Sequence, residues 1–106
     1  MDPNEFAAKF SQFMEFLNSR AVEHHKAHWP GSTRNPDTFD FEPGRKYVRI
    51  FRRDENGASR SCYCFVGMED GKIWKSAGWY APALNFPRGN IFDTMAAWEK
   101  LPYYGL

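Results

Sequence analysis

The chain has 106 residues, which is the size of one small domain, and 42% of them are hydrophobic. Ten Phe, five Tyr and four Trp supply enough apolar bulk to fold, and together with a net charge of +1 they argue against intrinsic disorder. No stretch approaches the ~20 apolar residues that a membrane-spanning helix requires.

The N-terminus and the two cysteines both bear on the compartment. The sequence begins MDPNEFAAKF, without the basic and then apolar stretch of a secretory signal, so we expect a cytoplasmic protein. Cys62 and Cys64 are too few for the disulfide framework of a small secreted domain. Cys62 and Cys64 would lie about 7 Å apart on the same side of one strand, a distance that disfavours a disulfide bond between them. We expect both cysteines to act as small buried apolar residues rather than as metal ligands.

Charge is divided unevenly along the chain. Residues 1–44 carry four Lys/Arg against seven Asp/Glu, whereas residues 45–80 carry eight against four. The second segment is therefore where we expect an anionic partner to bind.

Residues 1–30 predict a long amphipathic helix. Asp2 can cap it, Pro3 suits the first helical position and Glu5 can complete a capping box. One helical face collects the apolar residues Phe6, Phe10, Phe13, Met14, Leu17 and Ala21.

The last turns of this helix contain three histidines. His24 and His28 are one turn apart, a spacing that can bind a metal from one helix face. No acidic residue lies between them as in HExxH, so the favoured interpretation is partly buried histidines at the end of the core. We expect no metal and no cofactor.

Residues 31–45 contain two prolines and show no periodicity, which predicts a surface connector held to the core by Phe39 and Phe41. From residue 46 to 80 the apolar period changes to two. Asn56-Gly57 and Asp70-Gly71 are strong hairpin signals, so residues 46–80 predict a three-stranded antiparallel meander.

Two-residue turns would fix the register of this meander. Phe51 would then face Cys62, Arg49 would face Cys64, Tyr47 would face Val66, and Val66 would face Lys75. The face under the helix would carry Val48, Ile50, Tyr63, Phe65 and Trp74. The opposite face would carry Tyr47, Arg49, Phe51, Arg53, Cys62, Cys64, Val66, Ile73, Lys75 and Trp79.

After the meander, residues 81–90 predict a loop and residues 91–101 a second helix. Asn90 is the expected N-cap, Asp93 occupies the third helical position, and Pro102 stops the helix.

The most informative constellation is the mixture of rings and cations on one sheet face. Bases stack on aromatic rings while cations neutralise phosphates, which favours single-stranded nucleic acid or a nucleotide. Alternatively, the second helix or a partner subunit covers this face. The candidate residues are Tyr47, Arg49, Phe51, Arg53, Lys75 and Trp79.

Arg88, Gly89 and Asn90 precede the second predicted helix. Backbone N–H groups at a helix N-terminus attract anions, and Arg88 could clamp a phosphate. Helix entry alone explains the same residues. For catalysis the polar residues show no paired carboxylates and no base near either thiol along the sequence, so we expect no enzyme.

A string of residues between Lys46 and Asp93 forms a distinctive pattern: a Y-x-F-V strand, a Gly turn, a Lys-x-Ala/Gly-Trp strand, then Ala-Pro-Ala and Arg-Gly-Asn-Ile. Its members here are Tyr63, Phe65, Val66, Gly71, Ile73, Lys75, Gly78, Trp79, Ala81, Pro82, Ala83, Arg88, Gly89, Asn90 and Ile91. This pattern, under half of the chain, resembles small tailed-bacteriophage proteins. The resemblance implies an accessory protein of the bacterial host cytoplasm that occupies a host surface or sequesters a small nucleotide.

We therefore expect one α+β domain over residues 1–106: a long N-terminal helix packed on a three-stranded antiparallel meander, with a short C-terminal helix. Open sheet edges favour a homodimer. The expected function is non-enzymatic binding of a host macromolecule or an anionic ligand, with a counter-defence role among its uses and no membrane partner. The alternatives are a single-stranded nucleic-acid-binding module and a small enzyme.

Overall fold

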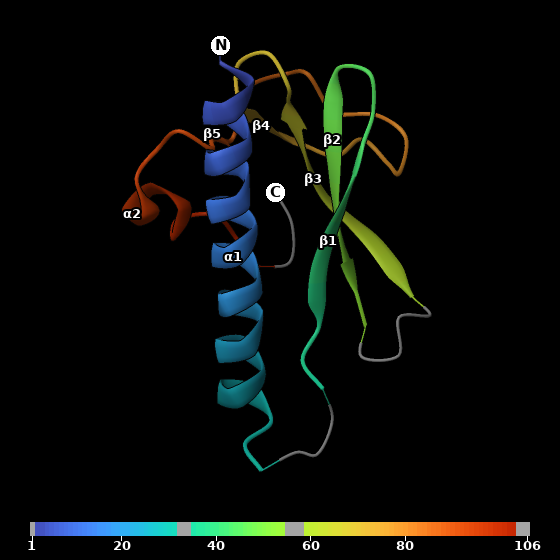
Figure 1. Ribbon diagram of the computed structural model, residues 1–106. Coiled ribbons are helices and arrows are strands. Elements are labelled where there is room, and N and C mark those ends of the chain that lie inside the picture. Colours follow the sequence, from blue (N-terminus) through green and yellow to red (C-terminus); the bar gives the residue numbers. More distant parts are fainter. Residues whose placement is uncertain (1, 32–34, 55–58, 104–106) are drawn as a thin grey trace.

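The computed structural model describes residues 2–31, 35–54 and 59–103. A long helix lies along one side of an antiparallel sheet, and a short helix follows the sheet, which confirms the α+β class (Figure 1). The sheet has five strands in sequence order rather than the three expected. The elements are α1 (Pro3–His28), β1 (Thr38–Pro43), β2 (Tyr47–Arg53), β3 (Arg60–Gly67), β4 (Lys72–Lys75), β5 (Gly89–Asn90) and α2 (Met95–Trp98).

Helix α1 forms as its local signals predict. Asp2 is the N-cap, and its carboxylate accepts a hydrogen bond from the Asn4 backbone N–H at 2.9 Å. The helix ends at His28, two residues before the predicted end at residue 30. Its buried residues are Phe10, Phe13, Met14, Phe16, Leu17 and Ala21, so the face is as predicted except that Phe16 joins it and Phe6 is only partly buried.

The predicted connector over residues 31–45 is wrong for its second half, which forms the edge strand β1. The sequence TFDFE alternates apolar and polar residues, as a half-buried strand does. Phe39 is buried and packs edge-on against Tyr63 at 5.2 Å, while the more exposed Phe41 packs edge-on against Phe10 at 5.0 Å. Both rings therefore hold this segment to the core, as predicted.

The outer edge of β1 is covered by its own chain. Asn18 of α1 accepts a hydrogen bond from the Phe39 N–H at 2.8 Å and donates one to the Phe39 carbonyl at 3.2 Å. The Phe41 N–H bonds to the Asp40 carboxylate at 2.8 Å, and Pro43 has no N–H. This edge therefore offers little to a pairing strand. A homodimer stays a prediction, and β1 is a poor surface for it.

The predicted register holds only at one end of the β2–β3 pair. Phe51 lies opposite Cys62 as expected, but Ile50 lies opposite Cys64, so Tyr63 is an extra residue in β3. Beyond this β-bulge, Arg49 faces Phe65 instead of Cys64, and Tyr47 faces Gly67 instead of Val66. The Asn56-Gly57 turn lies outside the described residues.

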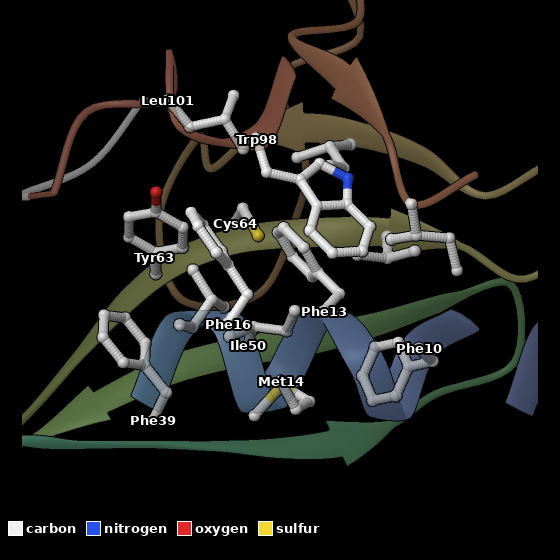
Figure 2. Packing of buried hydrophobic residues seen from close by; sticks show 14 of the residues in the cluster. Phe10, Phe13, Met14, Phe16, Phe39, Ile50, Tyr63, Cys64, Trp98 and Leu101 are labelled. Carbon is white, nitrogen blue, oxygen red and sulfur yellow. The ribbon is translucent and has the colours of Figure 1, made fainter. Parts of the chain in front are cut away.

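The bulge exchanges the predicted faces of β3 and β4. Cys64, Val66 and Ile73 are fully buried in the core beneath α1, whereas Phe65 and Trp74 leave that core. Figure 2 shows the side chains of Tyr63 and Cys64 together among the core residues, on the same side of the sheet as Phe13 and Phe16. A one-residue insertion has this effect because side chains alternate with period two.

The turn between β3 and β4 is also longer than predicted. Val66 pairs with Ile73 rather than Lys75, since residues 68–71 all lie in the turn. The Gly71 N–H bonds to the Gly67 carbonyl at 2.9 Å, and Gly71 has a φ of +74°, which a side chain would strain.

The predicted second helix over residues 91–101 is much shorter in the structure, where only Met95–Trp98 are helical. Helix α2 is capped by Thr94, whose hydroxyl accepts from the Ala97 N–H at 3.3 Å. Asn90 belongs to β5, where it pairs with Lys72, and its side chain caps a turn by accepting from the Phe92 N–H at 2.9 Å. Trp98 remains buried against α1, at 5.2 Å from the Phe13 ring.

Replacing Asn18 tests the covered edge. Asn18→Ala removes both hydrogen bonds to Phe39, and we expect the free energy of unfolding to fall by ~1–3 kcal/mol in urea denaturation. The exposed neighbour provides the control, since Ser19→Ala is expected to stay within ~0.5 kcal/mol. Equal effects of the two changes would contradict this role of Asn18.

Candidate functional site on the outer face of the sheet

The sheet surface turned away from α1, called the outer face below, collects most of the predicted site residues. The loop between β4 and β5, orange in Figure 1, extends past β2 on this side. It places Trp79 against Phe51 of β2, with 5.4 Å between the ring centroids. The outer face is formed by Tyr47, Arg49, Phe51, Arg53, Arg60, Phe65, Trp74, Trp79 and Tyr80.

Arg49 ties the loop to the sheet. Its Nε donates to the Trp79 carbonyl at 2.7 Å, and its guanidinium lies 4.7 Å from the Trp79 ring. On the other side it pairs with Glu42 of β1 at 3.4 Å. With its side chain only 19% exposed, Arg49 is a structural cation that shapes the site.

The other arginines of the outer face are also engaged. Arg53 pairs with Asp40 at 3.2 Å and lies over the Phe51 ring, and Arg60 pairs with Glu42 at 3.3 Å. Phe51 is 1% exposed, so its ring cannot stack on a ligand. Trp79 is contacted by both Arg49 and Arg60, which leaves little of its ring free.

Two other parts of the predicted site lie elsewhere. Lys75 is opposite Cys64, whose side chain points toward α1, so Lys75 leaves the sheet on that side. Gly89 and Asn90 form β5, next to β4 and far from β1 in the strand order. Arg88 lies over the Phe86 ring at 4.0 Å. The predicted helix N-terminus at Asn90 does not exist, since α2 begins at Met95.

A hollow of about 210 Å³ lies beside Arg49, between the β1–β2 turn and the β4–β5 loop. Arg45, Lys46 and Arg49 face a single carboxylate there, that of Glu42. The hollow is completed by the rings of Tyr47, Phe65 and Tyr80, together with Pro43, Gly44 and Pro82. It combines excess positive charge with aromatic surface, and one ring, Tyr80, is 87% exposed.

The β1–β2 turn that carries the two outermost cations has a defined backbone. The Gly44 N–H bonds to the Tyr47 carbonyl at 2.8 Å, and a Cβ on Gly44 would meet that oxygen at 2.9 Å. The Lys46 carbonyl accepts from the Met68 N–H at 2.9 Å. Arg45 and Lys46 are exposed, and neither forms an ion pair with the described residues.

Among the cations and rings of the hollow, sequence reasoning identified Tyr47 and Arg49 and missed the other four. Arg45 and Lys46 follow a Pro-Gly turn signal, and a search for cations at turns would have found them. Phe65 reaches the outer face only because of the bulge, and the position of Tyr80 depends on the path of the loop. No short sequence pattern predicts that Phe65 and Tyr80 lie in this hollow.

Comparison with known proteins places the chain in a family. The model of a family of unknown function, DUF7717, matches residues 4–101. The chain belongs to the DUF7717 family. No curated protein and no solved structure matches it. A function for this DUF7717 member therefore has to be inferred from the geometry of its side chains.

The thiols of this DUF7717 member are poorly suited to nucleophilic chemistry. Burial raises the pKa of Cys62, although Ser76 and Arg49 oppose the shift, and it raises the pKa of the buried Cys64 well above its usual range. A raised pKa keeps a thiol protonated near pH 7, and the thiolate is the reactive form.

The histidines at the end of α1 form a stacked cluster. The His24 ring lies 4.0 Å from both the His28 ring and the Tyr103 ring. Burial and the neighbouring His28 lower the pKa of His24, although Asp37 opposes the shift. Among residues 2–31, 35–54 and 59–103 there is no group of three possible metal ligands. In the same described ranges, every helix is too short or too polar to cross a bilayer.

A larger hollow, about 480 Å³, lies between α1 and the segment around α2. Its rings, Phe16 and Trp98, are 9% and 3% exposed and belong to the core. Its one cation, Lys9, is outnumbered by the carboxylates of Glu15 and Asp93. It therefore lacks the charge and the free ring that the outer-face hollow presents.

Two arginines of the site should respond differently to replacement. Arg49→Ala removes a charged hydrogen bond to the loop, and we expect the free energy of unfolding to fall by ~1.5–3 kcal/mol. Arg45→Ala removes an exposed side chain and should change it by less than ~0.5 kcal/mol. Urea denaturation followed by circular dichroism measures both. A larger loss for Arg45→Ala would show that the turn, not Arg49, holds the site together.

Proposed function

We propose that the protein is a non-enzymatic accessory protein that binds an anionic ligand in the outer-face hollow. The observation that carries this proposal is the composition of the hollow, in which Arg45, Lys46 and Arg49 face the single carboxylate of Glu42. Glu42 is already engaged by Arg49 and Arg60, so it does not neutralise the two turn cations.

The preformed turn supports the same function. Arg45 and Lys46 project from a backbone held by hydrogen bonds of Gly44 and Met68. An anion that binds there meets cations whose backbone is already placed, so little of the binding free energy is lost to ordering the turn.

A single-stranded nucleic-acid module, the alternative expected from the sequence, has weaker support. Such modules bind through several rings on which successive bases stack. Of the predicted rings, Phe51 is buried and Trp79 is contacted by two arginines. Tyr47 and Tyr80 are the rings that line the cationic hollow and reach solvent.

The protonated state of both thiols supports the non-enzymatic part of the proposal. The phage origin, the host cytoplasm and the counter-defence role implied by the resemblance stay predictions. A small enzyme would need a nucleophile or acid–base pair other than these thiols.

Titration with inorganic phosphate tests anion binding. We expect the amide signals of Gly44 and Tyr47 to shift and saturate in ¹H–¹⁵N NMR spectra, and not to shift with chloride at equal ionic strength. Arg45→Ala/Lys46→Ala should abolish the shifts, whereas Lys26→Ala/Lys100→Ala, which removes the same charge elsewhere, should retain them. Shifts that survive the first double replacement would overturn the proposed site.

A specific observation favours a second function, docking of a partner protein through the β4–β5 loop. Tyr80, Leu84 and Phe86 are 87%, 58% and 53% exposed. The loop that carries them is pinned by backbone bonds, among them Ala83 N–H to Lys75 and Arg88 N–H to Ile73, both 2.7 Å. Large apolar side chains held in solvent often mark an interaction surface.

A photo-crosslinking amino acid in place of Leu84 tests this second function in host cells. We expect an adduct of one defined mass from this position and none from a crosslinker at the exposed Glu23 of α1. The same adducts from both positions, or none from either, would count against a docking loop.

A further inference from the structure

We infer that the ligand of the outer-face hollow is a mononucleotide, with its base stacked on Tyr80 and its phosphate bound by Arg45 and Lys46. This inference rests on the proposed function, since it names the class of anion that the same hollow takes. It follows from three features of the hollow: a free ring, a local excess of charge, and a limited length.

The free ring is that of Tyr80. It is 87% exposed, and the backbone next to it is held to the sheet by the hydrogen bond from Arg49 to the Trp79 carbonyl, so the ring is open to a ligand while its attachment point is fixed. The Arg49 guanidinium lies 6.0 Å from the Tyr80 ring and 5.9 Å from the Phe65 ring. A planar base can stack on such a ring, and base–aromatic stacking strengthens binding about five- to hundredfold.

The two turn cations and the free ring come from different elements of the fold. Arg45 and Lys46 belong to the β1–β2 turn, whereas Tyr80 comes from the β4–β5 loop. Guanidinium and ammonium groups form short, charge-assisted hydrogen bonds with phosphate oxygens. A ligand that uses both sides therefore needs a planar ring and an anionic group in one molecule, which is the chemistry of a nucleotide.

The size of the hollow and its neighbour limit the ligand to one nucleotide. Its volume of about 210 Å³ is smaller than the ~300 Å³ of pockets that enclose a drug-sized molecule, so it holds part of one nucleotide, with the base lying on the exposed Tyr80 ring, and has no room for a second nucleotide. A second hollow of about 210 Å³ lies on the other side of Tyr47. It is lined by Lys46, Tyr47, Gly67, Glu69, Asp70 and Trp74, so Lys46 stands between the two hollows. Two carboxylates outnumber the one cation in this second hollow, so the next phosphate of a strand is disfavoured in this direction.

Calorimetric titration with AMP, ribose 5-phosphate and adenosine tests the inference. We expect AMP to bind about five- to hundredfold tighter than ribose 5-phosphate, because only AMP carries a stacking base. Tyr80→Leu should remove this advantage while the phosphate-induced NMR shifts of Gly44 and Tyr47 remain. Leu84→Ala, in the same loop but outside the hollow, should leave the affinity for AMP unchanged.

The outcomes separate the two proposals. Equal affinities for AMP and ribose 5-phosphate would overturn the mononucleotide and leave anion binding intact. Absence of phosphate-induced shifts, with no binding of AMP, would overturn both. A single-stranded hexanucleotide that binds more than tenfold tighter than AMP would assign the site to a strand instead.

Discussion

The extra residue at Tyr63 in β3 determines which side chains the two faces of the sheet present. Without this bulge, Cys64 and Val66 would point away from α1 and Phe65 would point toward it. With it, Tyr63 and Cys64 both enter the core, and Ile73 follows as the partner of Val66. Cys64, Val66 and Ile73 thus supply small and aliphatic side chains to the core beneath α1, beside the rings of Tyr63 and Phe39 (Figure 2). An aromatic ring, Phe65, is left for the outer face.

The outer-face hollow depends on the same bulge. Phe65 lines it because the shifted register sets this ring opposite Arg49. Arg49 in turn bonds to the Trp79 carbonyl and holds the loop that carries Tyr80. An arginine expected to bind a ligand therefore builds the site instead. The cations left for a ligand are those of the β1–β2 turn, whose backbone requires the glycine at position 44.

The parts of the structure that could be predicted from the sequence are those determined by residues close together in the chain. The Asp2 cap and the apolar face of α1 depend on residues within a few turns, so the helix was predicted almost to its ends. The bulge has no such signal, because every residue of CYCFV is apolar and a period of two cannot locate an insertion in it. Pro36 before β1 and Pro43 at its end concealed a strand that Asn18 and β2 stabilise. Asn90 was misassigned because pairing with Lys72, a distant residue, competes with its use as a helix cap.

The fold brings the acidic and basic segments of the chain next to each other. The acidic first segment of the chain supplies β1, and the basic second segment supplies β2, so the two neutralise each other across one strand pair. The pairs are Asp40–Arg53 and Glu42–Arg49, together with Arg52 and Asp37, the residue just before β1. Arg45 and Lys46 stand in the turn, after β1 has ended at Pro43 and before β2 begins at Tyr47. No residue of β1 lies opposite them, and their charge is not cancelled by the ladder of ion pairs. Positive charge available to a ligand therefore arises at the turn, where the acidic strand has stopped, rather than along the arginine-rich strand itself.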